Sequence, residues 1–247
     1  MKSTEDLLTL AETHKARFIY ISTISVGTVF DSHAEDYTFS EQDLYKDQLF
    51  TSPYTKSKFY SEIKVLEAIE AGLDAQIMRL GNLTSAYTGK LNMKNLTTNR
   101  FSIVMNDLLK LPFIGDSFSQ TEIEFSFIDI TARDIVTLAI SNATPIIYHV
   151  YSPHVLTMKN VLEETKDTDL PLINDEEFDK ALHELNMHEV IGLNSQASNQ
   201  ITGVTQSSMT QNLLRDLDEV WPKVTQHWLY QWRELLNEKF ECKEYHR

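Results

Sequence analysis

The segment RFIYIS, residues 17–22, is a short run rich in β-forming residues. It lacks a clean alternation of polar and apolar side chains, which predicts a strand covered on both faces, as in a parallel sheet. The preceding residues, 3–16, carry an apolar stripe at helical spacing. A helix followed by such a strand is half of a doubly wound unit, so the sequence predicts an α/β fold with a Rossmann-type parallel sheet.

The next helix and strand follow after a polar stretch. Residues 31–53 carry several acids and predict a surface loop. A helix is expected over 53–71, because Pro53 suits a first helical turn and Gly72 suits the left-handed residue after a helix end. Residues 74–80 then predict the next strand. The chain up to this point therefore predicts helix, strand, loop, helix and strand.

The remaining chain predicts shorter elements and a mainly helical end. We expect an α/β domain over 1–150, with inserted elements around 90–125, and a mainly helical subdomain over 151–247. Residues 192–207 are polar and predict a mobile connection. The other expected elements are helices over 99–110, 131–140 with Thr131 as cap, 157–166, 175–187, 207–219 and 221–239, and strands over 122–127 and 146–150.

The composition excludes several classes of protein. Lys and Arg total 22 against 36 Asp and Glu, and a net charge of −14 argues against a nucleic-acid partner. The single cysteine, Cys242, allows no internal disulfide and fits a reducing compartment. No apolar run approaches the roughly 20 residues of a membrane helix, and the polar N-terminus does not resemble a signal peptide. We therefore expect a cytoplasmic protein without a membrane partner.

Glycines are scarce and widely spaced. The chain has seven, and the closest two, Gly81 and Gly89, are eight positions apart. Neither G-x-G-x-x-G nor G-x-x-x-x-G-K-[ST] is present, so nucleotide-phosphate loops of these types are absent from this chain. The eight histidines have no metal-ligand spacing, and no metal site is expected.

Two tyrosine–lysine pairs have the spacing Y-x-x-x-K, which places both side chains on one helix face. They are Tyr54 with Lys58 and Tyr60 with Lys64. A nearby lysine favours the phenolate and brings the tyrosine pKa, ordinarily about 10, toward the range of an acid–base catalyst. Such a pair alone is more often a solvated helix face. Tyr54 is the stronger candidate because it begins its helix, where loops form sites, whereas Tyr60 lies mid-helix.

Thr23 follows the first strand, at the carboxyl end where open parallel sheets bind ligands. Three segments together resemble the extended short-chain dehydrogenase/reductase family: 18–27 (FIYISTISVG), 53–58 (PYTKSK) and 78–83 (MRLGNL). Within that family the chain is similar to the thioester reductase domains that end nonribosomal peptide synthetases and carboxylic acid reductases. The resemblance covers most of 17–190.

The resemblance implies a site and a reaction. The implied catalytic residues are Thr23, Tyr54 and Lys58, and the implied contacts to NADPH are Tyr54, Lys58, Gly81, Asn82 and Leu83. The implied reaction reduces an acyl or peptidyl thioester on a phosphopantetheinyl carrier protein and releases an aldehyde. In it, Tyr54 supplies the proton and Lys58 lowers the pKa of Tyr54 and holds the nicotinamide ribose.

The resemblance also implies how the chain divides. Residues 1–150 would be the C-terminal part of an NADP-binding Rossmann domain, and 151–247 would face substrate and carrier protein. The family's Gly-rich phosphate loop and adenosine-binding strand would precede residue 1. A sheet without its first strands exposes an edge, so we expect pairing with the missing N-terminal half or self-association.

Two alternatives stay open. A nucleotide-sugar epimerase or dehydratase shares the Thr, Tyr and Lys of the site but uses no carrier protein. A non-catalytic fragment, or one half of a split protein, belongs to a different class and would need its N-terminal part.

Overall fold

The computed structural model describes residues 2–27, 38–44, 50, 52–88, 95–142, 144–191 and 204–244. The chain forms two compact units. Unit 1 comprises Met1–Gly81, Thr131–Pro153 and Gln200–Val220, and unit 2 comprises Asn82–Ile130, His154–Asn199 and Trp221–Arg247. The units are interleaved along the chain, so they differ from the consecutive segments 1–150 and 151–247 expected from the sequence.

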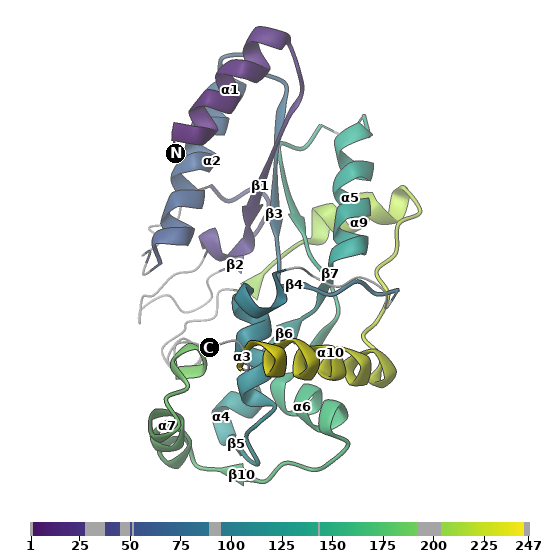
Figure 1. Cartoon of the computed structure of the whole chain (residues 1–247). Coiled ribbons are helices and arrows are strands. Elements are labelled where there is room, and N and C mark those ends of the chain that lie inside the picture. Colours follow the sequence, from purple (N-terminus) through teal and green to yellow (C-terminus); the bar gives the residue numbers. More distant parts are fainter. Residues whose placement is uncertain are drawn as a thin grey trace. The chain divides into compact units, whose positions relative to one another are not determined.

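Unit 1 contains a parallel three-stranded sheet with the order β1-β3-β8 (Figure 1). Its strands are β1 (Phe18–Thr23), β3 (Ala75–Leu80) and β8 (Ile147–Val150). Thr23 pairs with Leu80, so the carboxyl ends of β1 and β3 meet at one edge of the sheet. The central strand β3 is buried throughout, whereas β1 is buried only at its carboxyl end. The cover on both faces predicted for 17–22 is therefore found for β3 and not for β1.

Helices flank this sheet on both sides. Figure 1 shows α1 and α2 on one side and α5 and α9 on the other. Ser52 caps α2 by accepting a hydrogen bond from the backbone N–H of Tyr54, with Pro53 in the first turn. Gly72, with a φ of +104°, follows the end of α2 as predicted. The helices are α1 (Lys2–His14), α2 (Pro53–Glu70), α5 (Ile128–Ile140) and α9 (Ser208–Asp216).

A short parallel strand pair completes unit 1. It joins β2 (Thr38–Phe39) to β11 (Val204–Thr205). The prediction of a loop throughout 31–53 was therefore wrong at Thr38 and Phe39. Most of the predicted mobile connection, 192–203, lies outside the described residues.

Unit 2 is mainly helical, and short strand pairs join its loops. Phe125 and Phe127 pack edge-on against Trp228, which stacks on Trp232 with ring centres 5.6 Å apart. These four aromatic side chains are buried and form the centre of the core of this unit. Its helices are α3 (Arg100–Leu108), α4 (Asp116–Ser119), α6 (Met158–Lys166), α7 (Asp175–Glu184) and α10 (Gln226–Glu244), and its strands are β4 (Leu83–Thr84), β5 (Ile114–Gly115), β6 (Glu122–Glu124), β7 (Ser126–Phe127), β9 (Val155–Thr157) and β10 (Leu172–Ile173).

Two helices begin more than one residue away from the predicted start. α5 begins at Ile128, so Thr131 lies inside the helix and is buried instead of capping it. α10 begins at Gln226, so Trp221 precedes it. Within the described ranges, no helix combines the length and the apolar character that crossing a bilayer requires.

Candidate active site

Thr23 ends β1 and is buried at the carboxyl edge of the sheet. Its Oγ1 accepts a hydrogen bond of 3.2 Å from the backbone N–H of Ser25, in the 3-10 turn η1 (Ile24–Gly27) that follows. Gly27 closes this turn so tightly that an added Cβ would lie 2.2 Å from the Phe39 ring. The turn that follows Thr23 is therefore packed directly against Phe39 of β2.

Tyr54 lies in the first turn of α2. Ser52 caps this helix, and Pro53 is its first residue. Its side chain is 56% exposed, and its buried part raises the pKa of the phenol above the ordinary value. The ammonium of Lys58 lies 6.0 Å from the centre of the Tyr54 ring. The lowering of the Tyr54 pKa expected from Lys58 is therefore not found in this structure; the phenol stays protonated instead.

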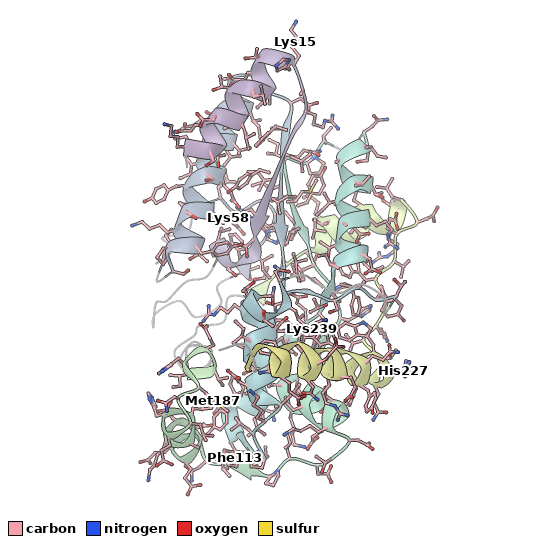
Figure 2. All side chains as sticks on the ribbon, in the orientation of Figure 1. Lys15, Lys58, Phe113, Met187, His227 and Lys239 are labelled. Atoms are coloured by element: carbon pink, nitrogen blue, oxygen red, sulfur yellow. The ribbon has the colours of Figure 1, made fainter. Side chains whose placement is uncertain are left out.

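Lys58 connects α2 to β1. Figure 2 shows it on α2, and its Nζ donates a hydrogen bond of 2.7 Å to the carbonyl oxygen of Ile21. The same ammonium lies 5.1 Å from the centre of the Tyr20 ring. Burial lowers the pKa of Lys58, and the negative charge of Glu62, one helical turn on, opposes that change. Tyr20 was not predicted as a contact of Lys58, although its place on the strand that ends at Thr23 could have indicated it.

The second tyrosine–lysine pair has a different environment. Lys64 forms an ion pair of 2.8 Å with Glu67 on the same helix. Tyr60 is 41% exposed and packs edge-on against Phe59. These contacts are those of a helix surface, so the structure distinguishes the two pairs that share one motif.

Backbone hydrogen bonds of Asn82 hold the segment that follows β3. Gly81 belongs to unit 1, and Asn82 and Leu83 belong to unit 2. The N–H of Asn82 donates to the carboxyl group of Glu124, and its carbonyl accepts a 3.0 Å hydrogen bond from the N–H of Ser126. The two polar groups of the Asn82 backbone are thus fixed within unit 2.

Glu124 has a buried carboxyl group and was not among the predicted site residues. Burial raises its pKa to about 7, while hydrogen bonds from Asn82 and from the Ser126 hydroxyl oppose the rise. Its sequence surroundings predict only a strand, and no local signal marks the residue as functional.

A buried polar network centred on Arg79 contacts α2 through Glu62. Arg79 on β3 is fully buried and forms an ion pair of 2.7 Å with Glu62 on α2. It also donates to the carbonyl of Asp43 and to Nε2 of His149. Burial and the Arg79 charge lower the pKa of His149 to about 3, so the ring is neutral and its Nδ1–H donates to the carbonyl of Gln206. The network links α2 to the two strands β3 and β8.

The structure thus brings Tyr54 and Lys58 to the same helix, and Lys58 to the strand that ends at Thr23. Lysine and tyrosine at a strand end are hydrogen-bond donors of the kind that hold ribose hydroxyls and stabilise an oxyanion. No group of three or more His, Cys, Asp or Glu suited to a metal occurs among the residues whose positions are described.

Comparison with known proteins places the chain in a family. A model of an NAD-binding family described as "Male sterility protein" matches residues 1–140, which is more than half of the chain. The chain belongs to this NAD(P)-binding family. A search of curated proteins finds no match.

Solved structures include close relatives of the chain. The reductase domain of the aureusimine biosynthetic cluster is 50% identical over 97% of this chain, with a TM-score of 0.92. A thiolation-reductase di-domain from an archaeal non-ribosomal peptide synthetase is 25% identical over 97% of the chain, with a TM-score of 0.82. The chain spans 65% of the first structure and 52% of the second. The resemblance to thioester reductases of the extended short-chain family is thereby confirmed.

The epimerase alternative finds weaker support. UDP-glucuronic acid 4-epimerase from Bacillus cereus is 16% identical over 96% of this chain and 65% of its own, with a TM-score of 0.62. At this identity the likeness shows the fold alone.

Proposed function

We propose that this chain takes part in the NADPH-dependent reduction of a carrier-protein-bound acyl or peptidyl thioester to an aldehyde. The observation that carries the proposal is the position of Lys58, which contacts β1 and lies beside the Tyr54 ring. The 50% identity to a biosynthetic reductase domain, and the joining of a reductase to a thiolation domain in another relative, support the thioester substrate and the carrier partner.

The described residues fit the nicotinamide end of NADPH. The Lys58 ammonium has three N–H groups, one of which bonds to Ile21, and the Tyr54 hydroxyl is a further donor. We infer that these groups hold the ribose and that the backbone of 81–83 contacts the nicotinamide. The seven glycines form no phosphate loop, so the pyrophosphate end needs other residues.

The catalytic roles follow from the chemistry of the side chains. NADPH, when bound, would be the source of the hydride that reduces the thioester carbonyl carbon. Thr23 and Tyr54 donate hydrogen bonds to the developing oxyanion, and Tyr54 transfers its proton to it. The raised pKa of Tyr54 keeps this proton in place until then, and Lys58 stabilises the phenolate that remains. The resulting hemithioacetal breaks its C–S bond, the hydroxyl proton passes to sulfur, and thiol and aldehyde separate.

Tyr54→Phe tests the proposal. We expect the rate of NADPH consumption with an acyl-loaded carrier protein to fall by about 10²-fold or more, because one oxyanion donor and the proton source are lost together. Tyr60→Phe is the matched control, since it alters the other Y-x-x-x-K pair on the same helix, and its turnover should stay near normal.

Three results would contradict the proposal. A loss of turnover in Tyr60→Phe alone would show that the wrong tyrosine is assigned. Unchanged turnover in both variants would exclude this chemistry and favour a non-catalytic role. Turnover of a UDP- or dTDP-sugar without carrier protein would favour the epimerase alternative.

A further inference from the structure

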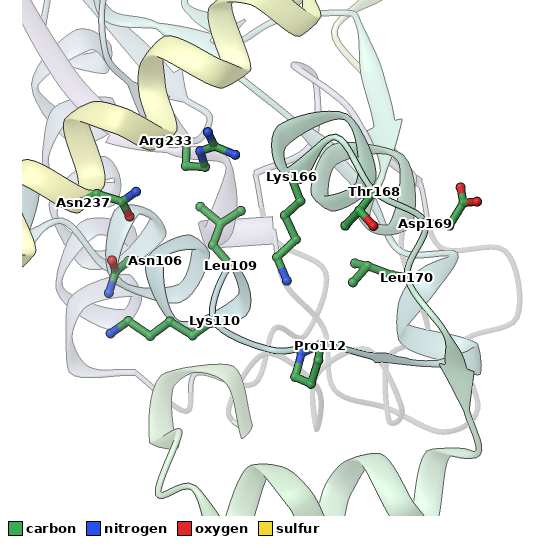
Figure 3. A pocket seen from close by; sticks show the side chains of 10 residues that line it. All are labelled: Asn106, Leu109, Lys110, Pro112, Lys166, Thr168, Asp169, Leu170, Arg233 and Asn237. Carbon is green, nitrogen blue, oxygen red and sulfur yellow. The ribbon is translucent and has the colours of Figure 1, made fainter.

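Unit 2 contains a cavity of about 540 Å³, and none of the residues that line it belongs to the candidate active site (Figure 3). It opens where the chain leaves α3 and α6, and α10 covers one side. The lining residues are Asn106, Leu109, Lys110, Pro112, Lys166, Thr168, Asp169, Leu170, Arg233 and Asn237. Cavities of this size hold small organic ligands.

The cavity is cationic in an acidic protein. Lys110, Lys166 and Arg233 line it, against one acid, Asp169, while the whole chain has a net charge of −14. In Figure 3 the Lys166 ammonium points into the space between Leu109 and Pro112, and the Asp169 carboxylate points away from it. Of the three cations, Lys166 is the one whose ammonium points into the space that a ligand would occupy.

Lys166 is the central cation. Its ammonium donates to the carbonyl of Leu111, and burial lowers its pKa. In the described part of the chain no carboxylate forms an ion pair with it, whereas Lys110 lies 3.6 Å from Asp107 and Arg233 pairs with Glu234. A neutral carbonyl satisfies one N–H of the ammonium and leaves its charge uncompensated, which an anion would correct.

The remaining lining residues define the rest of the ligand. Leu109, Pro112 and Leu170 offer apolar contact for a carbon chain. Asn106 and Asn237 offer amide donors and acceptors. A bare inorganic ion would use the cations and leave these surfaces unused.

We propose that this cavity binds the phosphate group of a small organic phosphate ester, with Lys166 and Arg233 at the phosphate and the carbon chain against Leu109 and Leu170. Lysine and arginine side chains that line one cavity can match the charge and the oxygens of a phosphate. Pantetheine 4′-phosphate combines a phosphate, apolar carbons and amides, so it is the probe of choice. Only this choice of probe rests on the proposed function.

Isothermal titration of the chain with pantetheine 4′-phosphate tests the proposal, and pantetheine and inorganic phosphate serve as the two comparison ligands. We expect the ester to bind more tightly than either, and to bind more weakly at high salt. Lys166→Gln should weaken binding of the ester about tenfold, as expected for the loss of one charge-assisted hydrogen bond. Lys180→Gln, an exposed change on α7 in the same unit, is the control and should leave binding unchanged.

Equal binding of the ester and of pantetheine would overturn the proposal, as would a folded Lys166→Gln protein that binds like the parent. Equal binding of the ester and inorganic phosphate would remove the role of the apolar wall. If Lys166→Gln fails to fold, Lys110→Gln, at a side chain 55% exposed, decides by the same criterion with a smaller expected loss. The assay contains neither NADPH nor thioester, so its outcome is independent of the proposed reaction.

Discussion

The buried carboxyl group of Glu124 makes the stability of the protein depend on pH. Its carboxyl group accepts hydrogen bonds from Asn82 and Ser126, and burial raises its pKa from the ordinary 4.5 to about 7. The folded protein therefore holds this proton more tightly than the unfolded chain. The contribution of Glu124 to stability is present below about pH 4.5, falls as the pH rises to about 7, and is constant above that.

Glu124→Gln should remove this pH dependence. An amide oxygen can still accept from Asn82 but does not ionise, so the variant should gain stability relative to the parent between pH 5 and pH 8, by up to about 3 kcal/mol. Urea unfolding of both proteins at the two pH values measures the change. Glu122→Gln, exposed on the same strand, is the control. A parent–variant difference that is equal at both pH values would refute the prediction.

At the scale of elements, the position of α2 depends on the ion pair between Glu62 and Arg79. The side chains of this pair are 3% and 0% exposed, and Arg79 also bonds to Asp43 and His149. If one side chain of this buried pair is removed, water cannot reach the other to solvate its charge. Because α2 carries both Tyr54 and Lys58, the network beneath the helix also holds the candidate catalytic residues in place.

Glu62→Ala should destabilise the protein by about 3–5 kcal/mol, since it leaves the Arg79 charge buried and unpaired. Glu67→Ala, on the same helix, removes only an exposed partner of Lys64 and should cost well under about 1 kcal/mol. Chemical unfolding monitored by circular dichroism compares the two. Similar losses for both variants would mean that the buried pair contributes no more than a surface pair.

At the scale of the whole molecule, β1 is an edge strand of the sheet formed by the described residues. In the described ranges β1 pairs with β3 alone, and Ile21 on it is 38% exposed. The opposite edge differs, because the N–H of His149 on β8 donates to the Thr210 hydroxyl of α9. Open parallel edges accept further strands, so β1 is the natural place for added chain or a second copy.

We expect the 247-residue chain to self-associate at micromolar concentration. Light scattering over a range of concentrations measures the mass. Ile21→Lys, which adds a charge at the β1 edge, should shift the distribution toward the monomer, and Val136→Lys, on the exposed side of α5, should not. A monomer at all concentrations would mean that other parts of the chain cover this edge.

Local interactions made much of the fold and of the site predictable. The strand 17–22, the helix starting at Pro53 and the turn at Gly72 depend on neighbours a few residues away, so spacing and capping rules located them. Thr23 and Tyr54 could be named because each lies at an element boundary that such rules predict, and Lys58 because it follows Tyr54 at helical spacing. Their catalytic role remains a prediction.

Tertiary structure alone decided the rest. Arg79 meets Glu62 across 17 residues and His149 across 70, and Glu124 meets Asn82 across 42. Whether such a side chain is buried, and what its pKa becomes, depends on partners that no local pattern specifies. The cationic cavity likewise joins Lys110, Lys166 and Arg233 from three segments that are far apart in the sequence. Sequence determined which segments form most of the helices and strands, because those choices are largely local. Packing determined which charges are desolvated and which share a cavity, because those depend on the whole chain.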